Sequence, residues 1–286
     1  MNHQKVRLPP GLTFVATPIG TARDITLRAL DVLASAEVIA AEDTRSLRRL
    51  MEIHGVPLEG RRILAYHDHS GAGARGKLLA ALSEGKSVAY ASEAGMPLIA
   101  DPGYDLARAA AEEGYVVTAA PGASAVLTAL TLAGLPTDAF FFAGFLPNAK
   151  VARRTRLEAL RAIPGTLVFY ESPKRIAASL ADMSEVLGAA RAAALCRELT
   201  KKFEEVRRGT LAELAADSET ATIRGEIVVI VDRGHSPMVK ETDIEQDLKL
   251  ALERETVRDA AELVSRMHDI PRRKVYQLAL ELTKRK

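Results

Sequence analysis

The chain contains several loops built from glycine, proline and other small residues, with few strong acids or bases among them. The longest is SEAGMPLIADPGY at residues 92–104, and TPIG (17–20) and PGASA (121–125) are of the same kind. Small residues let backbone N–H and C=O groups approach a ligand closely. Backbone amides suit an adenine edge or a carboxylate, and carbonyl oxygens beside an apolar wall suit a sulfonium. The loops are therefore compatible with S-adenosylmethionine as a cofactor.

Other chemical signatures are weaker. Residues 71–76 match G-x-G-x-x-G, but the four residues HDHS separate the preceding strand from the first glycine, whereas a dinucleotide-binding loop follows its strand at once. A nicotinamide or flavin enzyme is thus a remote alternative. His67 and His69 lack a third ligand, so no metal is expected. Ser124 is outside any G-x-S-x-G elbow, and the single cysteine, Cys196, is expected to be a buried thiol.

Length and composition describe an ordinary globular chain. It has 286 residues, of which 48% are hydrophobic and 27% charged, enough for two domains with separate cores. No run of 18 apolar residues predicts a membrane span, and the first residues lack the apolar segment of a secretory signal. We therefore expect a cytoplasmic protein with no membrane partner. The net charge of +2 indicates nucleic acid only weakly.

The first 121 residues predict an α/β domain. Short apolar runs at 12–17, 38–41, 62–66, 87–91 and 115–120 alternate with segments of helical periodicity. This alternation favours a parallel sheet with helices on both faces. Ligands of such sheets bind beyond the carboxyl ends of the strands, where the unusual loops of this chain all lie.

Residues 122–236 predict a second α/β domain with a mixed sheet. The segment at 202–209 follows two strand-like runs without a long helix between them, which favours antiparallel pairing. Residues 237–286 predict a helical extension of three helices and no strand. Its segment HDIPRRKVYQLALEL, in which Pro271 opens the last helix, resembles a helix-turn-helix, and a plain helical cap is the alternative.

The motifs together resemble one family. ATPIG, IAAEDTR, YHDH, SEAGMPLIADPGY, PGASA, FYESPKR, CRELTK and RGEIVVIV are similar, in order and spacing, to the ribosomal RNA small subunit methyltransferase I family of the tetrapyrrole methylase-like superfamily. The resemblance covers about residues 12–234 and continues more weakly beyond them. Glu93 and Met96 depart from the usual S-D-A-G-T-P, and Ala22 from a common Gly or Leu.

The resemblance implies a fold and a function. The fold is two α/β domains of the tetrapyrrole methylase type with a cofactor cleft between them. The implied reaction is S-adenosylmethionine-dependent methylation of the ribose 2′-hydroxyl of a cytidine in 16S rRNA, at the decoding centre. The implied partners are 16S rRNA or the 30S subunit, without DNA, and the implied assembly is a homodimer.

The resemblance also implies cofactor-binding residues, carried over by motif. They are Pro18, Ile19, Ser92, Ala94, Gly95, Ile99, Asp101, Ala123, Ser124, Ala125, Phe145, Leu146, Pro147, Tyr170 and Gly225.

Methyl transfer to a hydroxyl needs alignment and a proton acceptor, and no nucleophilic side chain is expected. Asp24, Glu171 and Glu198 are the candidate catalytic acids, each with a structural role as the alternative. Candidate contacts to RNA phosphates are Arg23, Arg45, Lys150, Arg153, Arg154, Arg156, Arg175 and Lys201. Two other functions stay open: a tetrapyrrole (uroporphyrin-type) C-methyltransferase of the same superfamily, and a non-catalytic RNA-binding assembly factor.

Overall fold

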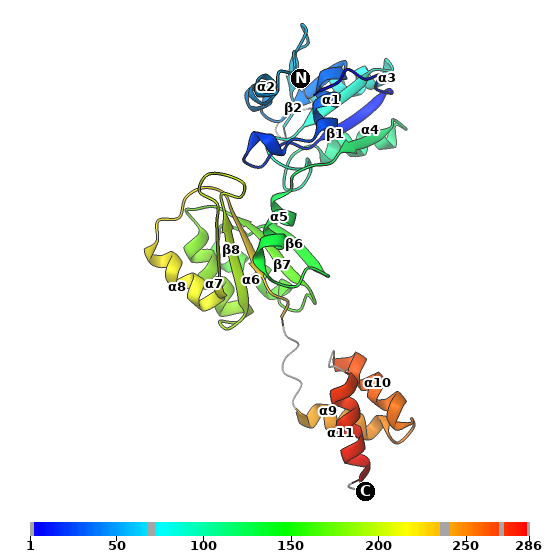
Figure 1. The fold of residues 1–286 in the computed structure, drawn as a ribbon, viewed down its shortest axis with the longest axis vertical. Helices are drawn as coiled ribbons and strands as arrows, with labels where there is room; N and C mark the ends of the chain where they lie inside the picture. Colours follow the sequence, from blue (N-terminus) through cyan, green and yellow to red (C-terminus); the bar gives the residue numbers. More distant parts are fainter. Residues whose placement is uncertain (1–2, 68–71, 235–240, 269–271, 285–286) are drawn as a thin grey trace. The chain divides into compact units, whose positions relative to one another are not determined.

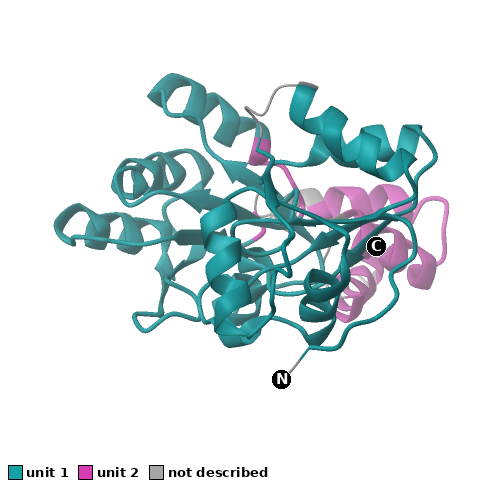
Figure 2. Ribbon diagram, turned by 90° about the horizontal axis from the view of Figure 1, so that it is seen from above, with its two compact units in different colours: residues 1–159, 165–232 teal, residues 160–164, 233–286 magenta. Residues whose placement is uncertain are grey.

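The computed structural model describes residues 3–67, 72–234, 241–268 and 272–284 (Figure 1). The chain packs as two compact units (Figure 2). One unit comprises residues 1–159 and 165–232, and the other comprises residues 160–164 and 233–286. The larger unit contains two five-stranded sheets.

The first sheet is parallel throughout, in the order β3-β2-β4-β1-β5. Its strands are β1 (Gly11–Val15), β2 (Val38–Ala41), β3 (Ile63–Ala65), β4 (Ser87–Ala91) and β5 (Val117–Ala120). Every residue of β4 is buried, as its unbroken apolar run predicts for a strand covered on both faces. The predicted parallel sheet is confirmed.

Helices cover both faces of this sheet. They are α1 (Leu27–Ser35), α2 (Thr44–Ile53), α3 (Ala72–Ser83) and α4 (Tyr104–Glu112), while the short 3-10 helix η1 (Ala22–Asp24) buries no side chain. Alternate residues of β4 enter different cores, because side chains alternate across a strand. Ala89 packs with Leu33 of α1 and Met51 of α2, whereas Tyr90 packs with Leu78 of α3 and the helix α4.

The second sheet is mixed, in the order β6-β7-β10-β8-β9. Its strands are β6 (Phe140–Phe145), β7 (Thr166–Glu171), β8 (Ala192–Arg197), β9 (Glu205–Thr210) and β10 (Ile227–Val231). β6 runs parallel to β7, while the β7–β10, β10–β8 and β8–β9 pairs are antiparallel. The predictions of a mixed sheet and of an antiparallel strand after β8 are therefore confirmed.

Four helices accompany the second sheet: α5 (Ala125–Ala133), α6 (Lys150–Leu160), α7 (Ile176–Leu187) and α8 (Leu211–Thr220). α5 packs Ala129 and Leu130 against Val168 and Val228 of the sheet. α7 packs against α8. A capping box begins α8, because Thr210 Oγ1 accepts from the Glu213 backbone N–H at 3.2 Å and Glu213 Oε2 accepts from that of Thr210 at 2.7 Å.

The smaller unit holds the three predicted helices, α9 (Glu241–Ala251), α10 (Val257–His268) and α11 (Arg272–Lys284). They form a core of their own around Leu248, Val264 and Val275. Pro271, predicted to open the last helix, lies outside the described residues. No helix in the described part of the chain has the length and apolar character needed to cross a bilayer.

Candidate functional site

Two loops at the carboxyl edge of the first sheet are joined by backbone hydrogen bonds. The β1 loop (residues 16–21) and the β4 loop (residues 92–103) meet where Thr17 and Gly95 exchange two N–H···O bonds of 3.0 Å. Ser92 supports this pair, because its Oγ donates to the Gly95 carbonyl at 2.7 Å. The loops predicted to form one ligand edge are thus a single hydrogen-bonded structure.

The β4 loop holds conformations that are costly for ordinary residues. Leu98 and Ala100 adopt φ of 70° and 60°, in the left-handed region. Gly95 has φ 83°, and a Cβ there would lie 3.3 Å from the Ile19 side chain and 3.5 Å from the Ala123 carbonyl. Such conformations cost of order 1–3 kcal/mol each and gather at ligand sites. The loop is therefore held in one shape by the structure around it.

The β1 loop packs against the turn after β8. The Thr21 backbone N–H donates to Thr200 Oγ1 at 3.2 Å. A Cβ on Gly20 would lie 2.8 Å from the Leu199 carbonyl oxygen, so this approach requires a glycine. Ile19 is 7% exposed and belongs to the core that α5 forms with the second sheet. These contacts join the β1 loop of the first sheet to the turn after β8 of the second sheet. The sequence motifs did not reveal them.

The predicted cofactor residues of the first sheet differ in exposure. Ala94 and Ile99 are exposed, Pro18, Asp101, Ala123 and Ala125 are half-buried, and Ser92 and Gly95 are buried. The Ser124 hydroxyl is used locally, because its Oγ accepts from the Leu127 backbone N–H at 3.4 Å and caps α5. The Ser124 hydroxyl is therefore engaged in capping α5, so a ligand would contact the backbone groups of Ser124.

The predicted residues of the second sheet form an aromatic pair and its surroundings. The rings of Phe145 and Tyr170 lie 5.5 Å apart, edge to face. Burial, with smaller effects from the carboxylates of Asp101 and Glu226, raises the pKa of Tyr170 to about 12. Since Asp101 belongs to the β4 loop, the structure brings that loop near Tyr170. Leu146 is buried, Pro147 is half-buried, and their carbonyls accept from Arg175 Nη2 at 2.5 and 3.3 Å.

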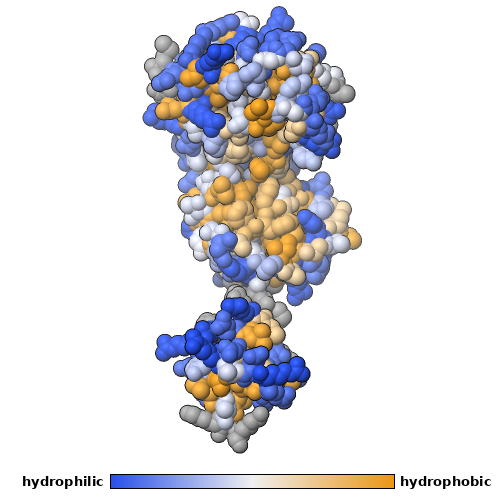
Figure 3. Space-filling model, turned by 90° about the vertical axis from the view of Figure 1, so that its right-hand side faces the viewer, coloured by the Kyte–Doolittle hydropathy of each residue, from blue (hydrophilic) through white to orange (hydrophobic). Residues whose placement is uncertain are grey.

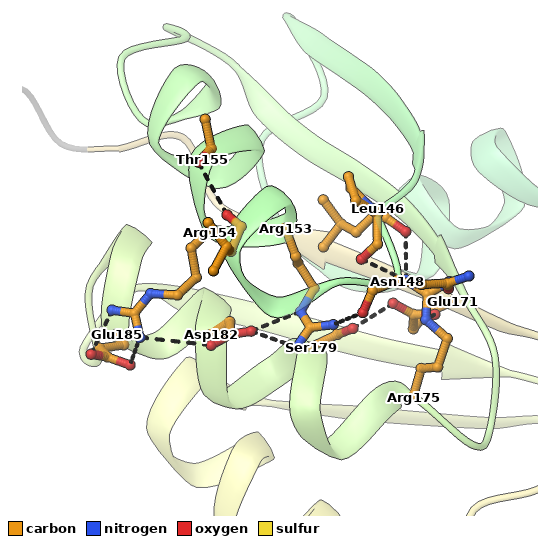
Figure 4. Close-up of polar contacts among 12 residues, drawn as sticks. Leu146, Asn148, Arg153, Arg154, Thr155, Glu171, Arg175, Ser179, Asp182 and Glu185 are labelled. Carbon is orange, nitrogen blue, oxygen red and sulfur yellow. Dashed lines mark hydrogen bonds and ion pairs between the residues drawn. The ribbon is translucent and has the colours of Figure 1, made fainter.

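The surroundings of Glu171 favour the structural alternative to its predicted catalytic role. Its carboxylate accepts from the Ser172 backbone N–H at 2.8 Å and from Ser179 Oγ at 2.5 Å. Arg175 Nε lies 3.4 Å from it, and the Glu171 side chain has no exposed surface (Figure 4). A carboxylate enclosed in this way anchors the β7–α7 turn and cannot reach a substrate hydroxyl.

Glu198 and Asp24, the other two candidate acids, have different surroundings. Glu198 Oε1 accepts from the Glu226 backbone N–H and from Lys201 Nζ, both at 3.1 Å. These interactions, the backbone one first, lower the pKa of Glu198 and make it a weaker base. Gly225 has φ 86° and leaves the space that this carboxylate occupies. Asp24 is exposed on η1, beside the β1 loop.

The predicted phosphate contacts divide into buried, paired and exposed cations. Arg153 is 5% exposed and pairs with Asp182, with Nη2 and Nε at 2.6 and 2.7 Å from Oδ2, which favours a structural role over the predicted RNA contact (Figure 4). Arg154 makes two bonds of 2.6 Å to Glu185. Four cations are exposed, namely Arg23, Arg45, Lys150 and Arg156.

Lys201 and Arg175 are also engaged. Burial alone would lower the pKa of Lys201, but hydrogen bonds to Glu226 at 2.9 Å and to Glu198 raise it overall. Arg175 holds the carbonyls after β6 and pairs with Glu171. Both side chains are therefore less available to RNA phosphates than the exposed cations are.

Two further expectations concern Cys196 and the histidines. Cys196 is buried, so the expectation of a buried thiol is confirmed, and burial raises the pKa of this thiol to about 11. His69 and the first glycine of the 71–76 motif lie outside the described residues. Within the described ranges no group of three or more His, Cys, Asp or Glu side chains could hold a metal ion.

Comparison with known proteins gives two family matches. The family model of tetrapyrrole (corrin/porphyrin) methylases matches residues 11–215, and the RsmI C-terminal HTH domain model matches residues 239–283. The ribosomal RNA small subunit methyltransferase I of Mesorhizobium japonicum is 50% identical over 277 residues, covering 96% of this chain and 93% of that protein. Its counterpart in Escherichia coli O157:H7 is 42% identical over 276 residues, covering 94% of each chain.

A solved structure shows the same fold. It is a uroporphyrin-III C-methyltransferase from Thermus thermophilus in complex with S-adenosyl homocysteine, with a TM-score of 0.53 and 17% sequence identity. The match covers 78% of this chain and 97% of that one. At this identity the likeness concerns the fold, and it confirms the predicted α/β architecture of the tetrapyrrole methylase type.

Proposed function

Because the chain belongs to the ribosomal RNA small subunit methyltransferase I family, we propose that it methylates the ribose 2′-hydroxyl of a cytidine in 16S rRNA, at the decoding centre. The observation that carries this proposal is 50% identity extending over 96% of the chain. The family, the methyltransferase activity and the S-adenosylmethionine cofactor expected from the motifs are confirmed by the same relatives.

The tetrapyrrole alternative depends on the superfamily alone. The tetrapyrrole methylase model stops at residue 215, whereas residues 239–283 of the helical extension match the RsmI C-terminal HTH domain model. Incubation of the protein with labelled S-adenosylmethionine and either 30S subunits or a uroporphyrin decides between the two. We expect label in the RNA, and label in the porphyrin would reverse the assignment. Absence of cofactor binding in calorimetry would instead favour a non-catalytic assembly factor.

The residues at the carboxyl edge of the first sheet fit this cofactor. Ala94 is exposed and small, so it leaves the β4 loop backbone open to a ligand, whereas Gly95 is buried with its N–H and C=O bonded to Thr17. Ala123 lies beside Gly95 without bulk. When bound, S-adenosylmethionine supplies a methyl group on a cationic sulfur. The chain's contribution is to fix its position: the Thr17–Gly95 hydrogen bonds and Ser92 hold the loop that would lie against it.

Positioning is the main contribution to catalysis in this proposal. Methyl transfer is an in-line displacement, and alignment of the reacting groups can lower a barrier by about 7–11 kcal/mol. The hydroxyl must also lose its proton. Asp24 is the exposed acid among the three candidates and lies next to the β1 loop, so we assign it as the proton acceptor.

Replacement of Asp24 tests this assignment. Asp24→Asn is expected to lower kcat by about 100-fold or more, the usual effect of general-base catalysis. Its affinity for S-adenosylmethionine should match the wild type in calorimetry. Glu112→Gln, an exposed change on α4, is the control. Wild-type turnover by Asp24→Asn would show that water or another group accepts the proton.

The exposed cations are the RNA contacts of this proposal, chiefly Arg23, Arg45, Lys150 and Arg156. Each phosphate contact releases counterions, so binding should weaken steeply with salt.

We place the reaction on 16S rRNA or the 30S subunit in the cytoplasm. We also keep the boundaries 1–121, 122–236 and 237–286 as the proposed domains.

Exposed apolar side chains support the proposed homodimer. β5 and β6 each lie at one of the two edges of their sheet, and an unprotected edge invites pairing with another chain. Phe140, Phe141 and Phe145 of β6 are 44%, 36% and 55% exposed. Figure 3 shows apolar surface gathered on one side of the second sheet. Light scattering should give a dimer that Phe141→Lys dissociates and Leu263→Lys does not, and a monomeric wild type would contradict the proposal.

A further inference from the structure

A hollow of about 430 Å³ lies beside helix α2 at the carboxyl edge of the first sheet, and we name it the α2 pocket. Four segments line it: α2, with Arg45, Arg49 and Ile53; the β1 loop, with Pro18; the first residue of η1; and the start of the β4 loop, with Ser92 and Glu93. Its volume lies within the range of about 300–1,000 Å³ that is usual for ligand pockets. Arg45 is among the proposed RNA contacts and Ser92 supports the candidate cofactor loop, but Arg49 and Ile53 have no role so far.

Two arginines at the rim give the pocket its charge. The side chains of Arg45 and Arg49 are 93% and 73% exposed. Their ionic partners are distant, Asp43 at 3.7 Å and Glu52 at 3.6 Å. Exposed pairs of this kind are weak, so either guanidinium can turn toward an incoming anion at little cost. Arginine is the side chain best suited to phosphate, which it binds through two parallel hydrogen bonds.

The N-terminus of α2 does not supply the anion site itself. Asp43 Oδ1 accepts from the backbone N–H groups of Arg45 and Ser46 at 2.7 and 3.2 Å. These bonds, the one from Arg45 first, lower the pKa of Asp43, so a carboxylate already occupies the helix end. An anion in the α2 pocket would therefore be held by the guanidinium groups.

The rest of the lining suits a sugar or base. Ile53 is 52% exposed although it is a large apolar residue, and with Pro18 it offers an apolar wall. Glu93, the acid in the lining, belongs to the β4 loop. The negative charge of Glu93 repels a phosphate, so a phosphate in the pocket is expected beside the arginines and away from the β4 loop. The pocket thus has a cationic rim and an apolar wall, which fits one nucleotide unit of RNA.

The floor of the α2 pocket is shared with the candidate cofactor site. Thr17 and Ser92 line the pocket, and the same two residues hold Gly95 and the β4 loop in place. A nucleotide seated in the pocket would therefore lie against the loop proposed to hold the methyl donor.

We propose that the α2 pocket binds the phosphodiester next to the acceptor ribose, with Arg45 and Arg49 on the phosphate and Ile53 against the sugar. This inference rests on the proposed rRNA substrate. It makes Arg45 and Arg49 positioning residues that place the 2′-hydroxyl at the cofactor loop, and it gives α2 a role that a general basic surface would not have.

The test compares two exposed arginine changes in one helix. Arg45→Gln with Arg49→Gln removes the rim charge, and Arg48→Gln is the matched control, because Arg48 is exposed on α2 and is not part of the lining. The full-length variants are assayed for methylation of 30S subunits, for binding of a 16S rRNA fragment by fluorescence anisotropy, and for S-adenosylmethionine affinity by calorimetry.

The double variant is expected to raise KM and the RNA Kd about tenfold or more. It should reduce the slope of log Kd against log salt by about 0.7, since both arginines contact one phosphate and each phosphate contact of a single strand contributes about 0.7. Its cofactor affinity should be unchanged, and Arg48→Gln should stay within about twofold of the wild type on every measure. If the wild type binds the fragment through these arginines but transfers no methyl group, the pocket stands and the proposed function fails. The inference would be overturned if the double variant bound RNA as well as Arg48→Gln does. It would also be overturned if the double variant lost as much affinity for S-adenosylmethionine as for RNA.

Discussion

The contact between the β1 loop and the turn after β8 can be tested by Gly20→Ala. A Cβ at this position would lie 2.8 Å from the Leu199 carbonyl oxygen and 2.7 Å from Lys201 Cγ. The carbonyl is backbone and cannot rotate away, so the loop and the turn must separate. Overpacking of this kind costs about 1–3 kcal/mol. Separation also breaks the 3.2 Å hydrogen bond from Thr21 to Thr200, which contributes about 0.5–1.5 kcal/mol.

We therefore expect Gly20→Ala to lower the free energy of unfolding by about 2–4 kcal/mol, measured by urea denaturation. Since the β1 loop also holds Gly95 through Thr17, S-adenosylmethionine affinity should fall about tenfold or more, which corresponds to about 1.4 kcal/mol.

Gly76→Ala is the control for this change. Gly76 is exposed in α3, and a Cβ there meets nothing within 4 Å. It should stabilise the protein by about 0.5–1 kcal/mol, because glycine is a poor residue for a helix interior. If Gly20→Ala matches Gly76→Ala in both stability and cofactor affinity, the packing of the β1 loop on the turn does not support the site.

The remaining predictions concern three buried or paired groups. Asp182→Asn leaves the guanidinium of Arg153 buried without its charge partner, so the free energy of unfolding should fall by about 3–5 kcal/mol. A variant as stable in urea as the wild type would argue against a buried pair. The lowered pKa of Glu198 means that its stabilisation is present above the ordinary value of 4.5 and is lost as the pH falls through the folded value. Glu198→Gln should therefore flatten the acid limb of a stability–pH profile, and an unchanged limb would refute this. Cys196, with its pKa raised to about 11, should react with iodoacetamide at neutral pH only after unfolding, and rapid labelling of the native protein would contradict its burial.

The architecture was predictable because its signals are local and periodic. Apolar runs such as SVAYA, bounded by helical segments, predict buried parallel strands, and β4 is buried along its whole length. The ligand edge followed from the same pattern, since loops after parallel strands share one side of the sheet. The bridge between Thr17 and Gly95 shows that two of these loops meet at that edge.

Individual side-chain roles were less predictable, because their partners are distant in sequence. Within KVARRTR, Arg153 is buried and Arg156 is exposed, and the difference arises from Asp182 on another helix. Glu171 resembled a catalytic acid by its motif, but Ser179 on α7 completes its enclosure. Arg49 lines the α2 pocket and Arg48 does not, although both are arginines of the same helix, so residue type alone could not separate them.

Mass mapping of 16S rRNA tests the central claim most directly. Purified protein is incubated with labelled S-adenosylmethionine and 30S subunits from cells that lack it, and the RNA is digested and sequenced by mass. The account predicts one new methyl group, on the ribose of a cytidine at the decoding centre. Label on a base, on several unrelated sites or on no RNA at all would contradict it.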